Sequence, residues 1–213
     1  GLTSGLSEES FERKKLNLVV VLDISGSMRS RFDKYFYDGS RSKTRKEDEM
    51  SSKMTIANES IVVMMKHLKE GDRFGVVLFD HHAYNAKPLR LVEHTDLEAF
   101  AGLILELSPQ GGTNWSDGYK QVIDLFDSLD KEMVDQSVYE NRIIFLTDAM
   151  PNTGELRKEG LFGLVRGAAS KGIYTSFIGV GIDFNPALVE NVTKTRGANY
   201  YSVHSAAYFK KRL

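Results

Sequence analysis

Three oxygen-bearing side chains directly follow an apolar stretch near the start of the sequence. The segment VVVLDISGSM, residues 19–28, carries Asp23, Ser25 and Ser27 at alternate positions. Carboxylate and hydroxyl oxygens are hard ligands, which suit Mg²⁺ or Mn²⁺ and argue against zinc or copper. Asp and Ser also stabilise turns by bonding to nearby backbone groups. The segment therefore indicates a metal site only if further ligands meet it.

Two later segments supply further oxygen ligands. The segment LTD, residues 146–148, ends an apolar run with Asp148, and the glycine-rich loop QGGTNW, residues 110–115, contains Thr113. The carboxyl ends of parallel strands converge on one edge of a sheet, where ligands bind. Two carboxylates and three hydroxyls, several acting through water, leave a position open on an octahedral ion. We therefore expect a Mg²⁺ or Mn²⁺ site, with Ca²⁺ as a further candidate, that recruits an acidic group.

The segments that must position these residues alternate between strands and helices. Apolar runs typical of strands buried on both faces lie at 16–22, 73–79, 142–146 and 173–180. Segments with helical spacing lie between them, at 54–68, 97–107 and 122–126. The alternation predicts an α/β fold of three layers, α/β/α, doubly wound around a mostly parallel sheet.

Shorter segments complete the predicted fold. Residues 79–94 predict a hairpin leading to one antiparallel edge strand near 88–92, where Pro88 is tolerated. A last strand is expected at 200–203, and further helices are expected over 160–172, 185–197 and 205–213. The polar segment 29–53 breaks this rhythm and predicts an insertion loop beside the metal site.

Composition limits the classes of function. The 213 residues contain no proline-rich or glycine/serine-rich linker, which predicts a single domain over 1–213. A formal charge of -1 gives no general attraction to nucleic acid. The absence of cysteine excludes disulfides and thiolate nucleophiles, and no apolar run approaches the about 20 residues of a transmembrane helix. The chain starts at Gly1 without a leader, which we interpret as an excised domain whose localisation stays open.

In their order and spacing, the segments DISGS, GGTN and LTDAMPN resemble the metal-ion-dependent adhesion site (MIDAS) of the von Willebrand factor type A domain. GVGIDFN and GANYYSV resemble later strands of the secreted bacterial and inter-alpha-inhibitor-like branch. The resemblance implies a metal-dependent protein-binding or adhesion module. It implies that Ser25, Ser27 and Thr113 bind the metal and that Asp23 and Asp148 bind it directly or through water. A partner protein's Asp or Glu carboxylate would complete the coordination, and a secreted or cell-surface location is favoured.

Two other functions stay open at this stage. One is an intracellular type A subunit that works as a scaffold with an AAA+ ATPase. The other is a Mg²⁺-dependent phosphotransferase of the haloacid dehalogenase type, which needs a second aspartate where this chain has Ser25. The chain has no Walker-type loop, GxSxG elbow or HExxH helix, so we expect no enzymatic activity.

Four nearby residues have ordinary interpretations. Asp80, His81 and His82 are expected to be turn residues rather than metal ligands, because no third partner stands at ligand spacing. Trp115 comes two residues after Thr113, and we expect it either to pack in the core or to contact a partner.

Overall fold

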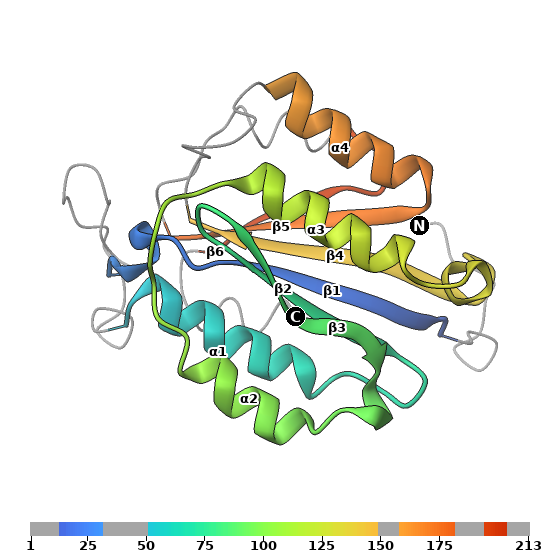
Figure 1. The fold of residues 1–213 in the computed structure, drawn as a ribbon, viewed down its shortest axis with the longest axis horizontal. Coiled ribbons are helices and arrows are strands. Elements are labelled where there is room, and N and C mark those ends of the chain that lie inside the picture. The colour runs from blue at the N-terminus through green and yellow to red at the C-terminus, as the bar shows by residue number, and fades with distance from the viewer. Residues whose placement is uncertain (1–12, 32–50, 149–157, 182–193, 204–213) are drawn as a thin grey trace, which may run out of the picture.

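A six-stranded sheet organises the molecule, as seen in a computed structural model (Figure 1). The structure describes residues 13–31, 51–148, 158–181 and 194–203. The strands are β1 (Lys15–Asp23), β2 (Arg73–Phe79), β3 (Ala83–Leu91), β4 (Tyr139–Thr147), β5 (Ile173–Val180) and β6 (Asn199–Val203). They lie in the order β3-β2-β1-β4-β5-β6. Neighbouring strands are parallel except for β2 and β3, which confirms the predicted mostly parallel sheet with one antiparallel edge.

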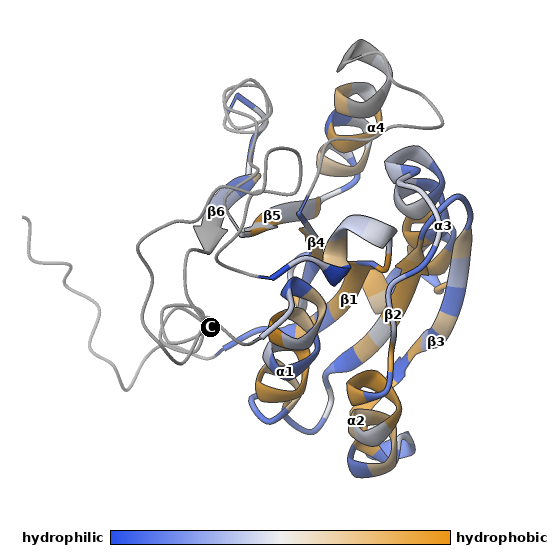
Figure 2. Cartoon of the chain, turned by 90° about the vertical axis from the view of Figure 1, so that its left-hand side faces the viewer, coloured by the Kyte–Doolittle hydropathy of each residue, from blue (hydrophilic) through white to orange (hydrophobic). Residues whose placement is uncertain are grey.

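Helices cover both faces of this sheet. On one side lie α1 (Lys53–Met65) and α2 (Leu97–Leu105), and on the other lie α3 (Trp115–Asp127) and α4 (Lys158–Ser170) (Figure 1). Along β1, Leu18, Val20 and Leu22 pack on the α1 side, while Val19 and Val21 pack on the α3 side. Figure 2 shows hydrophobic residues concentrated in the central strands and in the helices beside them. A strand buried on both faces needs no polar alternation, which explains the apolar run at its start.

Strand β4 is longer than the predicted 142–146. The prediction began too late because the first residues of the strand are polar. It begins at Tyr139, and Asn141 lies beside Asn17 of β1. The Asn17 side-chain amide donates to the Asn141 side-chain oxygen at 2.8 Å, and both residues are buried. The Asn141 side-chain amide in turn donates to the Val134 carbonyl oxygen at 2.9 Å. Because these buried polar groups are hydrogen-bonded, a pattern based on apolar residues cannot detect this part of the strand.

The edge strand β3 carries two features that discourage pairing with another chain. Pro88 lies within it, as predicted. Lys87 points inward, and its Nζ donates to the Phe74 carbonyl oxygen at 2.7 Å. Burial and the nearby positive charge of Arg90 lower the pKa of Lys87 to about 8. Inward-pointing charges and prolines are known protections of sheet edges.

Several predicted segments lie outside the described residues. These are the strand-to-helix segment 32–50, most of the predicted helix 185–197, and the helix at 205–213. At the two ends of the predicted 29–53 insertion, Arg29 ends the short helix η2 (Gly26–Arg29) and Lys53 begins α1. A bridge between Arg31 and Ser52 closes the base of this segment. In the described part of the chain, no helix has the length and apolar character needed to cross a membrane.

Asp72 holds the beginning of the sheet together, and we expect Asp72→Ala to cost about 3 kcal/mol of unfolding free energy. The Asp72 carboxylate accepts from Arg13 at 3.0 and 2.9 Å, from the Leu16 amide at 2.8 Å and from the Lys69 amide at 2.9 Å. Burial alone would raise its pKa, but these hydrogen bonds together lower it below 3.8. The contribution is therefore complete above that value and is lost as the pH falls below it.

Urea unfolding at several pH values measures this effect. The difference in unfolding free energy between the wild type and Asp72→Ala should be constant near neutral pH and should shrink as the pH falls below 3.8. A difference that stays constant into strong acid would contradict an ionised Asp72.

Candidate metal centre

The two predicted carboxylates meet at neighbouring strand ends. β1 ends at Asp23, and Asp148 follows the last residue of β4. The two strands are parallel neighbours, with Leu22 beside Leu146. Asp23 is 0% exposed and Asp148 is 2% exposed. The fold therefore brings together two buried carboxylates that lie far apart in the sequence.

Hydrogen bonds link the two carboxylates with the two serines. The Ser25 amide donates to Asp23 Oδ1 at 2.8 Å. The Ser27 hydroxyl donates to Asp148 Oδ1 at 2.7 Å, and Ser25 Oγ lies 3.0 Å from Ser27 Oγ. Because Ser27 has one hydroxyl proton, Ser25 must be the donor in that last bond. Four of the five predicted site residues thus form one buried polar group.

Thr113 lies on a loop that is tied to the end of β1. The Gln110 amide donates to the Ile24 carbonyl oxygen at 2.6 Å, and the Gly26 amide donates to the Gly111 carbonyl oxygen at 3.1 Å. Thr113 itself is buried, at 3% exposed. The backbone therefore brings the predicted fifth ligand beside the loop that carries Ser25 and Ser27.

The turn between β2 and β3 fixes the other side of the Thr113 loop. The Gly112 amide donates to His81 Nδ1 at 3.0 Å, and the Asn114 side-chain amide donates to the His81 carbonyl oxygen at 3.1 Å. Gly111 has φ 71°, and a Cβ there would lie 2.8 Å from both Asp80 Oδ2 and His81 Nδ1. Only glycine fits this close approach.

The turn residues behave largely as predicted. Asp80 accepts from the His82 amide at 3.0 Å, a local turn contact. His81 and His82 are exposed. The sequence did not reveal the contact of His81 with the Thr113 loop, since the two segments are brought together only by the fold. Trp115 is 1% exposed and packs inside the protein, so it is not a surface contact.

Two residues missed in the sequence complete the polar group. The Thr147 hydroxyl donates to Asp23 Oδ2 at 2.5 Å. Lys53 Nζ donates to Asp148 Oδ2 at 2.8 Å, and both side chains of this ion pair are fully buried. Thr147 had a weak signal, because it stands next to Asp148 at a strand end. Lys53 had none, because a lysine at a helix start is usually solvated.

The electrostatics of the group favour a cation. Burial raises the pKa of Asp23 to about 7, and the negative charge of Asp148 adds to this, while hydrogen bonds from Ser25 and Thr147 oppose it. When both carboxylates are ionised, Asp23, Asp148 and Lys53 together carry one net negative charge. A further cation nearby would relieve the repulsion between the two carboxylates.

The donor set fits a hard divalent ion. It consists of carboxylate and hydroxyl oxygens, as Mg²⁺ and Mn²⁺ prefer. Across the described ranges there is no cluster of three or more His, Cys, Asp or Glu side chains that could hold a metal. The predicted site has two carboxylates and three hydroxyls, so metal binding here depends on neutral hydroxyls and water as well as on charge.

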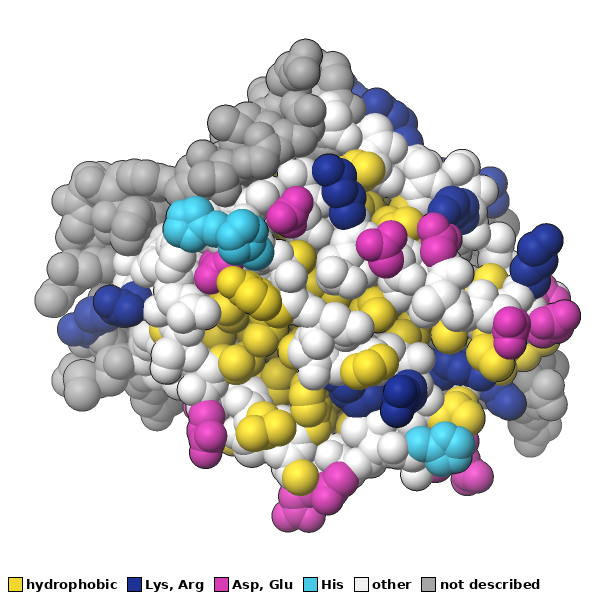
Figure 3. Space-filling model, viewed as in Figure 1, with side chains coloured by type: hydrophobic (Ala, Val, Ile, Leu, Met, Phe, Trp, Pro, Cys, Tyr) yellow, Lys and Arg dark blue, Asp and Glu magenta, His cyan; other side chains and the backbone are white. Residues whose placement is uncertain are grey.

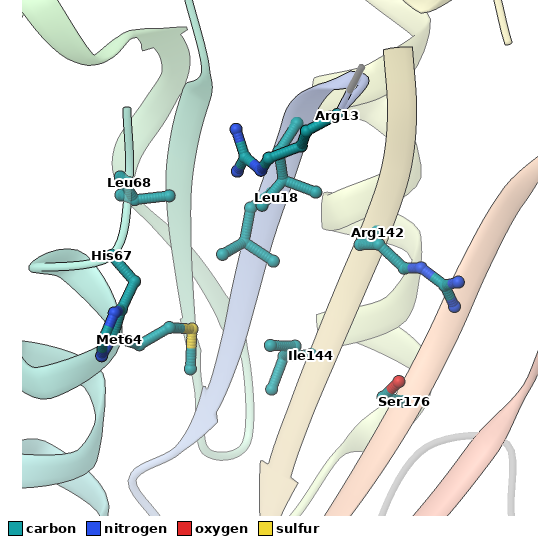
Figure 4. Close-up of a pocket in the computed structure, with 9 residues that line it drawn as sticks. Arg13, Leu18, Met64, His67, Leu68, Arg142, Ile144 and Ser176 are labelled. Atoms are coloured by element: carbon teal, nitrogen blue, oxygen red, sulfur yellow. The ribbon is translucent and has the colours of Figure 1, made fainter. Parts of the chain in front are cut away.

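A separate hollow lies at the opposite end of the strands. It has a volume of about 330 Å³ and lies between the end of α1 and the first halves of β1 and β4 (Figure 4). Its lining includes Leu18, Met64 and Ile144, together with Arg13 and Arg142. None of the described residues that line it carries a carboxylate.

Among the described side chains in view, Lys and Arg are interspersed with Asp and Glu, and none of these side chains form a basic patch on that face (Figure 3). This distribution agrees with the formal charge of -1.

Comparisons with known proteins agree with the fold. Residues 18–151 match the family model described as the von Willebrand factor type A domain. Inter-alpha-trypsin inhibitor heavy chain H1 of Mesocricetus auratus is 27% identical over 172 residues, which cover 79% of this chain and 16% of that protein. The chain thus spans about a sixth of the length of this curated relative.

Solved structures share the fold at low sequence identity. A von Willebrand factor type A protein from Catenulispora acidiphila superposes with a TM-score of 0.69 at 18% identity, covering 93% of this chain and 40% of that one. Proximal thread matrix protein 1 from the mussel byssus, with a zinc-occupied MIDAS motif, has a TM-score of 0.66 at 18% identity, covering 93% of this chain and 46% of that one.

Proposed function

Because the chain belongs to the von Willebrand factor type A domain family, we propose that it is a protein-binding module that uses a divalent cation to recruit an acidic residue of a partner. The proposed ligands are Asp23, Ser25, Ser27, Thr113 and Asp148. The observation that carries the proposal is the buried hydrogen-bonded group that joins the two serines to the two carboxylates. Mg²⁺ or Mn²⁺ suits these oxygens best.

The residues of the chain have distinct roles in this proposal. Ser25, Ser27 and Thr113 offer neutral oxygens to the ion. The hydroxyl proton of Ser27 is directed to Asp148, and one Ser27 lone pair accepts from Ser25, which leaves the other lone pair available to a cation. Thr147 and the Ser25 amide hold both oxygens of Asp23 in place. When bound, the ion supplies a Lewis-acid position for the carboxylate of the partner.

Titration calorimetry with Mg²⁺ and Mn²⁺ tests the metal site directly. Saturable binding with one ion per chain supports the proposal. No heat of binding at millimolar concentrations of either ion would contradict it. Zinc belongs in the same experiment, because a related fold holds zinc at its MIDAS motif.

The partner is a separate question. Pull-downs with and without EDTA, with the surrounding protein present, should recover a partner only when divalent metal is available. A partner that binds through this edge of the sheet in EDTA would count against carboxylate recruitment. An AAA+ ATPase among the recovered proteins would favour the scaffold function instead.

The enzymatic alternative has its own test. A panel of phosphate esters should remain unhydrolysed in the presence of Mg²⁺. Turnover that is lost on Asp23→Ala would replace the binding function with phosphotransfer.

His81→Ala should weaken Mn²⁺ binding about fivefold, because it removes one hydrogen bond that positions the Thr113 loop. The measurement is the Mn²⁺ dissociation constant from the electron paramagnetic resonance signal of the free ion. His82→Ala is the matched control, since His82 is also exposed and is a residue of the same turn. Equal affinities in the two variants would show that His81 does not position the loop.

A further inference from the structure

Lys53 places a positive charge inside the protein, next to the proposed metal ligands. It is the first residue of α1, and its Nζ lies 2.8 Å from Asp148 Oδ2 with both side chains fully buried. Gly181, which follows β5, leaves room for it. A Cβ at Gly181 would lie 2.7 Å from Lys53 Cε, and its φ of 97° also favours glycine. The charge is therefore held against Asp148 rather than shared with solvent.

We propose that Lys53 is an internal counter-ion that keeps the metal-loaded site positively charged and so makes it select an anionic group of the partner. This inference rests on the proposed function and names the feature that sets its specificity. Asp23 and Asp148 alone would neutralise a divalent cation. With Lys53 added, the ion and these three described side chains together carry one net positive charge in buried surroundings, where charges act strongly. A carboxylate from outside neutralises it, whereas a neutral oxygen does not.

Lys53 also limits how Asp148 can serve the metal. The two Asp148 oxygens have different partners, because Oδ2 accepts from Lys53 and Oδ1 accepts from Ser27. This division favours one-oxygen or water-mediated contact with the ion over contact through both oxygens. Lys53 should therefore weaken the binding of the metal while strengthening the binding of the carboxylate that follows.

The start of α1 is secured by other contacts. Ser52 caps the helix by accepting from the Thr55 amide at 3.0 Å. The Lys53 amide donates to the Ser30 carbonyl oxygen at 2.9 Å. These contacts do not involve the Lys53 ammonium group. The need to start α1 at this residue therefore does not explain why a charged side chain is buried here. If Lys53 had only a structural role, replacing it would change stability. It would not change metal affinity and carboxylate affinity in opposite directions.

Lys53→Met tests the inference with two probes. The first is Mn²⁺ alone, titrated by electron paramagnetic resonance, and we expect its affinity to rise about tenfold because a repelling charge is removed. The second is acetate added to the Mn²⁺-loaded protein, followed by broadening of the acetate methyl resonance. Acetate affinity should fall by about tenfold.

Lys87→Met is the matched control. Lys87 is also buried, but its ammonium group donates to the Phe74 carbonyl oxygen. Phe74 lies near the start of β2, away from the carboxyl ends of the strands where the candidate site lies. This variant should leave both affinities unchanged. If Lys53→Met does not fold, Lys53→Gln takes its place, because it removes the charge and keeps a hydrogen-bond donor on a shorter side chain.

The outcomes separate the two proposals. If the wild-type protein binds no Mn²⁺, the proposed function fails and the inference fails with it. If the wild type binds Mn²⁺ and acetate but the Lys53 variant leaves both affinities unchanged, or moves them in the same direction, the counter-ion role is overturned and the proposed function stands. Opposite shifts, absent in Lys87→Met, support the inference.

Discussion

Asp23→Ala is expected to abolish the rise in melting temperature that Mg²⁺ or Mn²⁺ gives the wild-type domain. An ion that binds only the folded state at 100 times its dissociation constant adds about 2.7 kcal/mol of stability. For a domain of this size that corresponds to a shift of about 5 to 10 °C. The variant loses a carboxylate that the Ser25 amide and the Thr147 hydroxyl hold in place, so the shift should disappear.

In EDTA the same variant should lose less stability than Asp72→Ala does, because relief of charge repulsion offsets the loss of two hydrogen bonds. Asp23 is a buried carboxylate that faces the charge of Asp148, and both burial and that charge disfavour its ionised form. Its removal relieves this repulsion when no metal is present. A variant that loses as much stability in EDTA as Asp72→Ala and is still shifted by metal would show that Asp23 is a structural residue and not a ligand.

Asp72→Ala is the control for this experiment. It also removes a buried aspartate, but one at the beginning of the sheet, where it bonds to Arg13 and to the Leu16 and Lys69 amides. The control should melt at a lower temperature and keep the full metal-induced shift. Scanning calorimetry on the three proteins, each with EDTA and with metal, measures both quantities.

The fold was largely predictable because its strands are buried on both faces. The runs at 73–79 and 173–180 coincide with β2 and β5. The beginning of β4 was missed, since the buried Asn141 side chain is hydrogen-bonded to Asn17 across the sheet and to the Val134 carbonyl oxygen. A pattern search detects the need to bury apolar surface, but it cannot detect polar groups that satisfy each other after folding.

The candidate site was predictable where its side chains follow strand ends. Asp23 and Asp148 could be placed together because the ends of adjacent parallel strands share an edge. Lys53 and His81 could not be placed, because each reaches the site from an element whose position depends on the whole fold. The sequence therefore predicted that these oxygen-bearing side chains would meet, but not that a buried lysine would accompany them.

Trp115→Ala is expected to lower the free energy of unfolding by about 3 to 5 kcal/mol, as removal of a large buried aromatic side chain does. Trp115 begins α3 and is 1% exposed. Its ring lies 5.4 Å from the ring of Phe145 and 6.1 Å from that of Phe177, measured between centroids. Alanine would leave a cavity between α3 and the sheet, two residues from Thr113, so Mn²⁺ affinity should fall as well.

Trp115→Phe separates the loss of the ring from the loss of the indole nitrogen. Within the described ranges, Trp115 Nε1 is buried and has no hydrogen-bond partner, so phenylalanine gives up part of the ring without breaking a hydrogen bond. We expect it to cost less than half as much as alanine and to keep Mn²⁺ binding. Urea unfolding and Mn²⁺ titration of both variants measure the two effects. Equal losses in stability for the two variants would contradict this role of ring packing. They would show that contacts with Phe145 and Phe177 do not hold the start of α3 and the adjoining Thr113 loop against the sheet.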